Sequence, residues 1–540
     1  MSAKISLCVF VSLFILSSVK IFSQANGDFR SNGQGKWDAA ATWQKFNGST
    51  WGPASAAPTG SENITIQASD SVDVNIPVTI TGKIIGFGGK LGNSLANLTF
   101  GNNGVYEHAV NAKSVPSATW GTGSTCMFTG VVDTMPSNNK QNYYNFSWNC
   151  ASYGTSALNL GWGGNTISGN LNVIKGNAAK TYLRLTAQNI GVQGPGANVI
   201  TINGDINIGN SSVIDTNTAL TSTGSSGQDT IAIYVKGNIT SYGNFNVANG
   251  SGAACNWYLS GDLKLQDGLM TTNSATGDKA DSVFFVGSTK QTFFKADSLG
   301  SISNVNFVVS PGAIVDLTTT SIGGSATTFA QSSGSTLMTS HKKGLSGNLS
   351  MSGTNAVKLP VDGNYQYNGE ASQVDTLLPV TVNNLNINNP DTVSFKKAIT
   401  VNGILTLQKG LLDNSIYAIT IGTGGSVVFA GGTTAVPIPG WPQGIKEIAV
   451  APRVFKLFNN YPNPFNPSTQ IRFSVPKNGF TTLKVMNILG QEVTNLFEGN
   501  AKSGSILEIT FDARNLPSGI YFARLQQGDN VSIQKMNLIK

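Results

Sequence analysis

The sequence predicts an all-β protein, in which a parallel β-solenoid (β-helix-like) body is followed by a small immunoglobulin-like β-sandwich. Three observations support this prediction. Only 11% of the 540 residues are charged while 62 are glycine, which is typical of chains with many strands and many polar turns. A glycine-containing motif recurs along residues 61–431. Residues 455–540 contain closely spaced segments of alternating polar and apolar residues.

Residues 1–24 are predicted to be a secretory signal peptide. Lys4 supplies a positive charge, Ile5–Ile15 is an apolar run, and small residues suit cleavage near Ser23–Ala25. The apolar run is too short to span a bilayer as a helix of the mature protein. We therefore expect the chain to leave the cytoplasm and to pass through the periplasm.

Residues 25–60 form a tryptophan-rich segment with Trp37, Trp43 and Trp51. Such residues can cover the open end of a solenoid, whose apolar core would otherwise be exposed. They can also form a platform on which sugar rings stack. We favour an N-terminal cap, because an open solenoid end has to be covered whatever the protein binds.

The recurring motif of the body is a glycine, then an asparagine or aspartate in most copies, then alternating aliphatic and polar residues. Its copies are Gly169–Val173, Gly204–Ile208, Gly237–Ser241, Gly261–Leu265, Gly347–Met351 and Gly403–Leu407. The glycine is expected to adopt a positive φ in a turn, and the alternation gives one apolar face to bury. The first spacings, 35 and 33 residues, suit solenoid coils. A string of β-sandwich domains is the competing fold.

Charge is distributed unevenly along the chain. Residues 25–451 carry 22 basic and 22 acidic residues, whereas residues 452–540 carry ten basic and five acidic ones. A neutral body offers no electrostatic surface for nucleic acid. Residues 432–454 are rich in proline and show little alternation, so they are expected to be a linker.

Cysteine and histidine chemistry is sparse. Cys126, Cys150 and Cys255 are too few for a disulfide framework, and a Cys126–Cys150 bridge is left open. His108 and His341 are far apart, have no nearby acidic cluster, and are expected to be surface residues. We therefore expect no cofactor, no metal site and no catalytic residues.

Segments of the tail follow one another in a specific order. They are YPNPFNPST at Tyr461–Thr469, LKVMNILG at Leu483–Gly490, LPSGIY at Leu516–Tyr521 and KMNLIK at Lys535–Lys540. In this order they resemble the type A C-terminal sorting domain of the type IX secretion system, also called the Por secretion tail. That family occurs on β-helix-like surface proteins of the Bacteroidetes/Ignavibacteria type.

The resemblance implies both a role and partners. Such a domain directs its cargo through the type IX translocon to the outer-membrane surface or the medium. A surface peptidase then removes the domain, here within Gly444–Arg453, and the cargo is released or linked to lipopolysaccharide. The implied recognition element is the terminal segment with Lys535, Met536, Leu538 and Lys540. The whole sorting-signal motif comprises Tyr461, Pro462, Asn463, Pro464, Phe465, Asn466, Pro467, Gly490, Gly519, Tyr521, Lys535, Met536, Leu538 and Lys540.

An Asp-Ser/Thr-aliphatic pattern recurs in the body and is absent from the tail. It resembles the O-glycosylation sequon of exported Bacteroidetes proteins, with the acceptors Ser71, Thr134, Thr230, Ser282, Ser298, Thr376 and Thr392. The alternative is that Asp-Ser and Asp-Thr simply end turns before strands.

The role of the body is predicted to be adhesive or structural. One alternative is a carbohydrate-active β-helix enzyme, a polysaccharide lyase or hydrolase, for which Asp278 and Asp281 are the nearest acidic pair. The other is a carbohydrate-binding protein without catalysis. Clustered carboxylates on one solenoid face would favour the enzyme, and a flat face of Asn, Ser and Thr would favour adhesion.

Overall fold

The computed structural model is an all-β fold. It describes residues 24–150, 158–175, 183–186, 199–209, 219–221, 230–248, 254–271, 281–296, 302–324, 326–351, 356–438, 443–450, 454–501 and 503–540. The predicted signal peptide falls on residues outside these ranges, apart from Gln24. The described helices are α1 (Ser94–Asn97), α2 (Leu345–Asn348) and the 3₁₀ turn η1 (Ala40–Thr42). None of the helices within these ranges is long and apolar enough to cross a membrane.

The described chain divides into two compact units, residues 24–107 with 116–119 and residues 108–115 with 120–540. In the first unit, consecutive coils are stacked through parallel strand pairs. The pairs are β5 (Asn63–Ile66) with β8 (Lys83–Gly86), β6 (Ser71–Asp73) with β9 (Lys90–Gly92), and β7 (Val78–Ile80) with β10 (Leu98–Phe100). β11 (Val105–His108) and β12 (Thr119–Trp120) lie at the division between the units.

The tryptophan-rich segment begins the stack of the first unit. β1 (Phe29–Ser31) and β2 (Gln34–Lys36) pair in parallel with β5 and β6. β3 (Trp43–Phe46) then runs antiparallel along the other edge of β1, and β4 (Trp51–Pro53) pairs with β3. The edge of the parallel sheet is thereby paired, which protects it from other chains.

Trp37 and Trp43 are side chains of this tryptophan-rich segment. Both are buried, with their rings in a T-shaped contact 5.0 Å apart. The Trp43 indole N–H donates to the Trp37 carbonyl at 2.8 Å. Burial of both faces leaves no ring surface for a sugar, which favours the capping role for these two residues. Trp51 is half-buried, with the Arg30 guanidinium 4.6 Å from its ring centroid.

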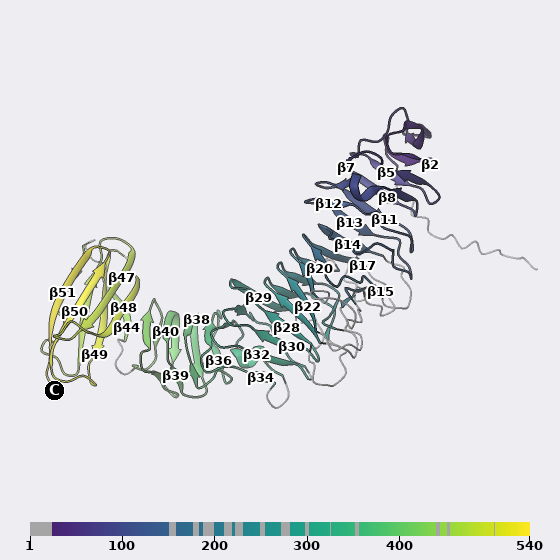
Figure 1. The fold of residues 1–540 in the computed structure, drawn as a ribbon. Helices are drawn as coiled ribbons and strands as arrows, with labels where there is room; N and C mark the ends of the chain where they lie inside the picture. The colour runs from purple at the N-terminus through teal and green to yellow at the C-terminus, as the bar shows by residue number, and fades with distance from the viewer. Residues whose placement is uncertain are drawn as a thin grey trace, which may run out of the picture. The chain divides into compact units, whose positions relative to one another are not determined.

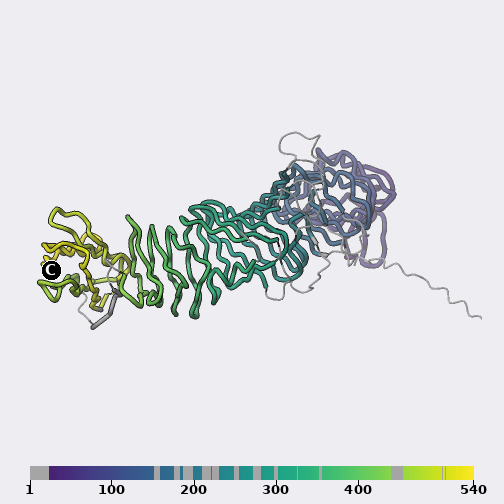
Figure 2. The backbone as a smooth tube through the Cα atoms, turned by 90° about the horizontal axis from the view of Figure 1, so that it is seen from below, coloured from purple at the N-terminus to yellow at the C-terminus, as the bar shows by residue number. Residues whose placement is uncertain are grey.

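The second unit contains further solenoid coils, seen as stacked turns in Figures 1 and 2. Its first parallel sheet consists of β16 (Thr166–Ile167), β19 (Val199–Ile202), β22 (Ile231–Val235), β25 (Cys255–Leu259), β28 (Ser282–Phe285), β30 (Asn306–Val309), β32 (Thr328–Gln331) and β34 (Val357–Lys358). A second row follows the order β13 (Thr125–Phe128), β14 (Asn145–Asn149), β17 (Leu171–Lys175), β20 (Ile206–Ile208), β23 (Ile239–Ser241), β26 (Leu263–Leu265) and β29 (Lys290–Lys295).

The second row continues towards the C-terminus. It runs through β31 (Ile314–Asp316), β33 (Thr336–Thr339), β35 (Asn364–Tyr367), β38 (Leu385–Phe395), β40 (Ile404–Asp413) and β42 (Ser426–Phe429). β36 (Gln373–Asp375) pairs with β38, and β43 (Thr433–Thr434) pairs with β40. The remaining side is formed by β15 (Leu158–Asn159), β18 (Leu183–Arg184), β21 (Ala219–Thr221), β24 (Asn244–Asn246) and β27 (Met270–Thr271), and later by β37 (Thr381–Val382), β39 (Ile399–Val401) and β41 (Ile419–Ile421).

Four copies of the glycine motif stack directly on one another, which confirms the predicted solenoid. Their first aliphatic residues are aligned in the order Leu171, Ile206, Ile239 and Leu263, and all four are buried. The apolar side of each of these four copies therefore faces the same continuous core, as a coil that cannot bury its face alone requires.

The Asn or Asp of the motif links each coil to the next. The Asn170 Oδ1 accepts the backbone N–H of Asp205 at 2.8 Å. The Asp205 carboxylate accepts that of Asn238 at 2.7 Å, and Asn238 Oδ1 accepts that of Asp262 at 2.8 Å. Asn and Asp can both occupy this position, because the contact to the next coil needs only one side-chain oxygen that accepts a hydrogen bond.

The glycine of the motif has a different role from the predicted one. Gly204, Gly237 and Gly261 are not among the residues with positive φ. A Cβ at Gly237 would lie 2.5 Å from the Gly204 carbonyl oxygen, and one at Gly261 would lie 2.4 Å from the Gly237 carbonyl oxygen. Glycine is required because the backbones of adjacent coils approach closely, not because a turn demands a left-handed conformation.

The copy at Gly347–Met351 departs from the pattern. Its first residues end helix α2 instead of entering a strand, and Gly347 lies against the His341 imidazole. The Asn348 amide is buried and donates to the Thr320 carbonyl at 2.6 Å. The glycine-asparagine sequence forms a helical corner at this position, because the Asn348 side chain donates hydrogen bonds to backbone carbonyls inside the coil.

The expected linker at residues 432–454 contains two strands. β43 belongs to the last described solenoid coil, and β44 (Gln443–Val450) pairs antiparallel with β49 (Ser505–Asp512) of the tail. Within this proline-rich segment the chain therefore leaves the solenoid and joins the tail, since β43 pairs with a solenoid strand and β44 with a strand of the tail. The region Gly444–Arg453, in which the resemblance places cleavage, overlaps β44.

The cysteines and His108 are interior groups. Cys126, Cys150 and Cys255 are buried thiols, so the structure does not contain the Cys126–Cys150 bridge. Burial raises the pKa of Cys126. The expectation that His108 lies on the surface is wrong, since its side chain is buried beside Phe128 with ring centroids 5.3 Å apart.

Candidate functional site

The tail is a sandwich of two antiparallel four-stranded sheets. One has the order β44-β49-β46-β45, with β45 (Lys456–Leu457) and β46 (Ser468–Ser474), and the other has the order β48-β47-β50-β51. The strands of the second sheet are β47 (Gly479–Met486), β48 (Glu492–Ala501), β50 (Gly519–Gln527) and β51 (Asn530–Leu538). The sandwich thus has eight described strands, one of which is β44 from the expected linker.

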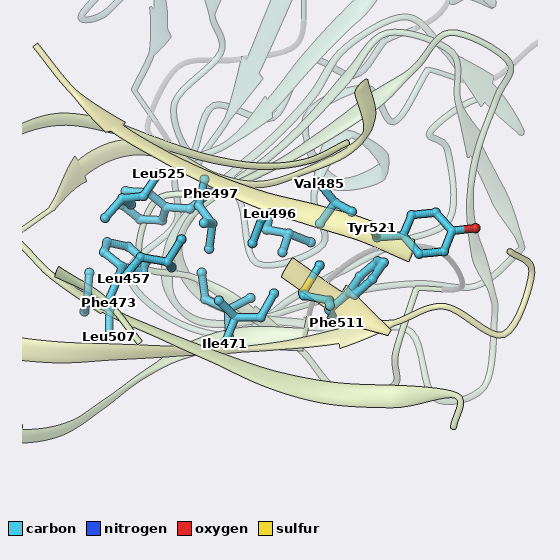
Figure 3. Packing of buried hydrophobic residues seen from close by; sticks show 14 of the residues in the cluster. Leu457, Ile471, Phe473, Val485, Leu496, Phe497, Leu507, Phe511, Tyr521 and Leu525 are labelled. Carbon is cyan, nitrogen blue, oxygen red and sulfur yellow. The ribbon is translucent and has the colours of Figure 1, made fainter. Parts of the chain in front are cut away.

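Alternating side chains of both sheets form the core of this sandwich (Figure 3). Ile471 and Phe473 come from β46, and Val485 and Leu525 come from the opposite sheet. All four are fully buried. The period-2 pattern of these strands is therefore explained by one core-facing residue in every pair.

The proline-rich entry loop Tyr461–Thr469 is held by its own backbone carbonyls. Tyr461 and Gln470 exchange two backbone hydrogen bonds, of 3.0 and 2.9 Å. The Pro462 carbonyl accepts from the Thr469 hydroxyl at 2.7 Å and from the Asn460 amide at 3.1 Å. Because proline offers no backbone donor, these side chains supply the polar contacts that fix the loop.

The entry loop also pairs with the end of the chain. The Phe465 N–H donates to the Asn537 carbonyl at 2.9 Å, and the Ile539 N–H donates to the Phe465 carbonyl at 3.0 Å. The Asn463 side chain accepts from the Asn537 N–H at 2.9 Å and donates to the Lys535 carbonyl at 3.2 Å. The two motifs that the resemblance identifies at opposite ends of the tail therefore form one structural unit.

Side chains of these two motifs divide into buried and exposed groups. Phe465, Met536 and Leu538 are buried, and the Phe465 ring lies 5.8 Å from that of Phe511. Lys535 and Lys540 are exposed. The Lys540 ammonium donates to the Arg514 carbonyl at 2.6 Å, which fixes the last residue against the sandwich. The terminal motif thus combines core anchors with surface cations.

Gly490, Gly519 and Tyr521 serve local structure. Gly490 has φ +76° in the turn after β47, a conformation that glycine adopts without strain. At Gly519 an added Cβ would meet open space, and nothing in the structure requires glycine there. The Tyr521 hydroxyl donates to the Pro517 carbonyl at 2.8 Å, and burial raises the pKa of Tyr521.

Residues 459–540 match the family model described as a secretion system C-terminal sorting domain. The tail is a type IX secretion sorting domain. Its presence indicates that the chain is exported by the type IX system to the cell surface or the extracellular space, and it makes the secretion machinery a partner. The comparisons with curated proteins and with solved structures returned no match. The sorting domain begins near the start of the entry loop, so the match does not extend to the solenoid.

Outside the sorting domain, the candidate chemical groups are not brought together. Within the described ranges no three His, Cys, Asp or Glu side chains gather in a way that could hold a metal. His108 Nε2 lies 2.8 Å from the Ala112 carbonyl, and burial lowers the pKa of His108. His341 Nδ1 accepts the Lys343 N–H at 3.0 Å. Of the candidate acidic pair Asp278 and Asp281, Asp278 lies outside the described residues.

The candidate glycosylation acceptors differ in exposure. Thr134, Thr230 and Thr376 are exposed, Ser71 and Thr392 are half-buried, Ser282 is buried, and Ser298 lies outside the described residues. The preceding aspartates have structural contacts: Asp281 accepts the Cys255 N–H at 2.8 Å and Asp375 accepts the Tyr367 hydroxyl at 2.6 Å. Glycosylation stays a prediction, and the burial of Ser282 argues against that acceptor.

Proposed function

We propose that the chain is an adhesive or structural protein of the outer surface, in which the sorting domain provides export and the solenoid body makes the contacts. The observation that carries this proposal is the composition of the outward solenoid positions. Asn172, Asn207 and Thr240 are aligned on three consecutive coils, and Gln366, Asn386 and Thr406 on three others. Rows of uncharged hydrogen-bonding side chains suit adhesion to polar surfaces.

The proposal includes a body without catalytic activity. The acidic side chains Asp281 and Asp375 are buried and accept hydrogen bonds from the fold itself. A glycosidase or lyase would need such carboxylates at the surface beside a substrate. The carbohydrate-active enzyme remains the alternative, and it would require a carboxylate pair that faces a cleft.

Export is proposed to follow the order implied by the domains. A signal peptide brings the chain to the periplasm, the type IX translocon carries it outward, and a surface peptidase cuts near β44. The body is then released or linked to lipopolysaccharide. Pairing of β44 with β49 supports a cut outside this ladder, because a peptidase binds an extended chain that is not already paired.

A localisation and adhesion experiment tests this proposal. In a host with a working type IX system, the full chain is compared with a version lacking residues 443–540 and with a strain lacking the chain. We expect external protease to reach the body only in the full-length strain. Adhesion to a glass or polysaccharide surface should fall to the level of the deletion strain when the tail is absent. Adhesion that is equal in all three strains would exclude the adhesive role.

A further inference from the structure

A groove of about 320 Å³ lies on the outward face of β33, β35, β38 and β40, which are adjacent in the second row of strands. β38 and β40 are labelled in Figure 1. The outward side chains lining this groove are Thr336, Asn364, Gln366, Asn384, Asn386 and Thr406. We call it the amide groove. Its lining includes no charged side chain, in a body whose charges cancel.

The amide groove presents one hydrogen-bonding side chain per coil along its length. Gln366, Asn386 and Thr406 are in register on three successive strands. Neighbouring strands lie about 4.8 Å apart, which is close to the length of one sugar ring in an extended chain. A ligand that lies across the coils would therefore meet an equivalent polar group at each of its units.

Several polar groups of the amide groove have no partner within the described chain. The Asn386 Oδ1 is enclosed and accepts no hydrogen bond. The hydroxyls of Thr336 and Thr406 make none that the structure records, and the Gln366 amide uses only its nitrogen, which donates to Asn368 at 2.6 Å. The Asn386 oxygen is closed off from the groove, whereas Thr336 and Thr406 are half-buried, so their two hydroxyls are the groups that can bond with a ligand.

Other side chains hold the walls of the amide groove in place. Asn364 Oδ1 accepts from the Asn384 amide at 2.7 Å, and Asn384 Oδ1 accepts the Ile404 N–H at 2.7 Å. Ile404 itself is 45% exposed and adds an apolar surface to the lining. The groove thus combines prearranged amides with one apolar side chain, the pairing that binds a ring with hydroxyl edges and an apolar face.

The pairing of its strands and the lack of charge in its lining restrict the ligands that the amide groove can bind. Its strands are paired on both edges, so a peptide could not add to them by backbone hydrogen bonds. A nucleic acid or an acidic polysaccharide would need cations that the lining lacks. We propose that the amide groove binds an uncharged oligosaccharide that lies across successive coils. This inference rests on the proposed surface role for its biological setting and gives that role a ligand class.

The binding test uses the purified full chain, so it is independent of export. Hexasaccharides of β-1,4-linked glucose, xylose and mannose are titrated by calorimetry, with an oligogalacturonate hexamer as the charged probe. We expect at least one neutral probe to bind and the charged probe not to bind. Binding by none of the neutral probes, or equal binding by the charged one, would overturn the inference.

Variants locate the binding in the groove. The double variant Asn386→Leu with Thr406→Val should weaken binding at least about tenfold, because it replaces two polar side chains of the lining, one of them a hydroxyl without a partner among the described residues. Thr400→Val is the matched control, since Thr400 is a half-buried outward residue of β39 and lies outside the lining of the groove. Ile404→Asp, at an exposed position, serves as a second variant if the double variant melts early. Unchanged binding in the groove variants would overturn the assignment.

Discussion

Replacement of Gly237 by alanine is expected to lower the stability of the solenoid by at least about 2 kcal/mol. The added Cβ would lie 2.4 Å from the Asp205 carboxylate and 2.5 Å from the Gly204 carbonyl oxygen. The backbones of two coils must then separate, which also stretches the 2.7 Å bond between Asp205 and the Asn238 N–H. Because coils are stabilised mainly by their neighbours, the loss should extend to the coils on both sides.

The effect of Gly237→Ala can be measured by thermal unfolding and by hydrogen exchange in β20, β23 and β26. Gly52→Ala is the control, because no atom lies within 4 Å of the Cβ position at Gly52 and its φ is ordinary. The control should change stability by less than about 0.5 kcal/mol. Equal stability of Gly237→Ala and the unmodified chain would show that the coils are not packed as closely as described.

Replacement of Phe465 by alanine is expected to destabilise the sorting domain by about 3–4 kcal/mol. Phe465 is 2% exposed and packs beside Phe511, while its backbone pairs with the end of the chain. The substitution leaves a cavity beneath the entry loop and loosens the contact between this loop and the terminal recognition segment. We therefore expect export to fall together with the unfolding temperature of the domain.

Tyr461→Ala is the matched control for Phe465→Ala. The Tyr461 side chain is 73% exposed, and the loop contacts of this residue with Gln470 are made by its backbone. Its stability should stay within about 0.5 kcal/mol of the unmodified chain. If Phe465→Ala left both unfolding temperature and export unchanged, the entry loop would not be part of the unit that supports recognition.

Much of the fold could be predicted from local patterns. The period-2 alternation identified the strands, and four of the glycine motifs proved to be equivalent positions on stacked coils. The reason for the glycine could not be predicted, because close approach of backbones depends on a neighbour 24 to 35 residues away. The helical corner at Gly347 was missed for a similar reason, since Asn348 is satisfied by Thr320 of the preceding coil.

In the tail, too, the local sequence predicts the motifs, whereas the contacts between residues far apart in the sequence could not be predicted. Its motifs were recognised from their residues, and the family match supports them. Their contact, made by Asn463 with the backbone of Lys535 and Asn537, has no local signal. The prolines around β44 predict a linker, and only the pairing of β44 with β49 shows that it belongs to the sandwich.

The C-terminal domain is expected to be sufficient for export. A reporter protein with a signal peptide is fused to residues 443–540, which include β44, and is expressed in a host with a working type IX system. We expect external protease to reach the fused reporter, whereas the same reporter without these residues should stay protected in the periplasm. Retention of the fusion inside the cell, or surface exposure of both reporters, would contradict it.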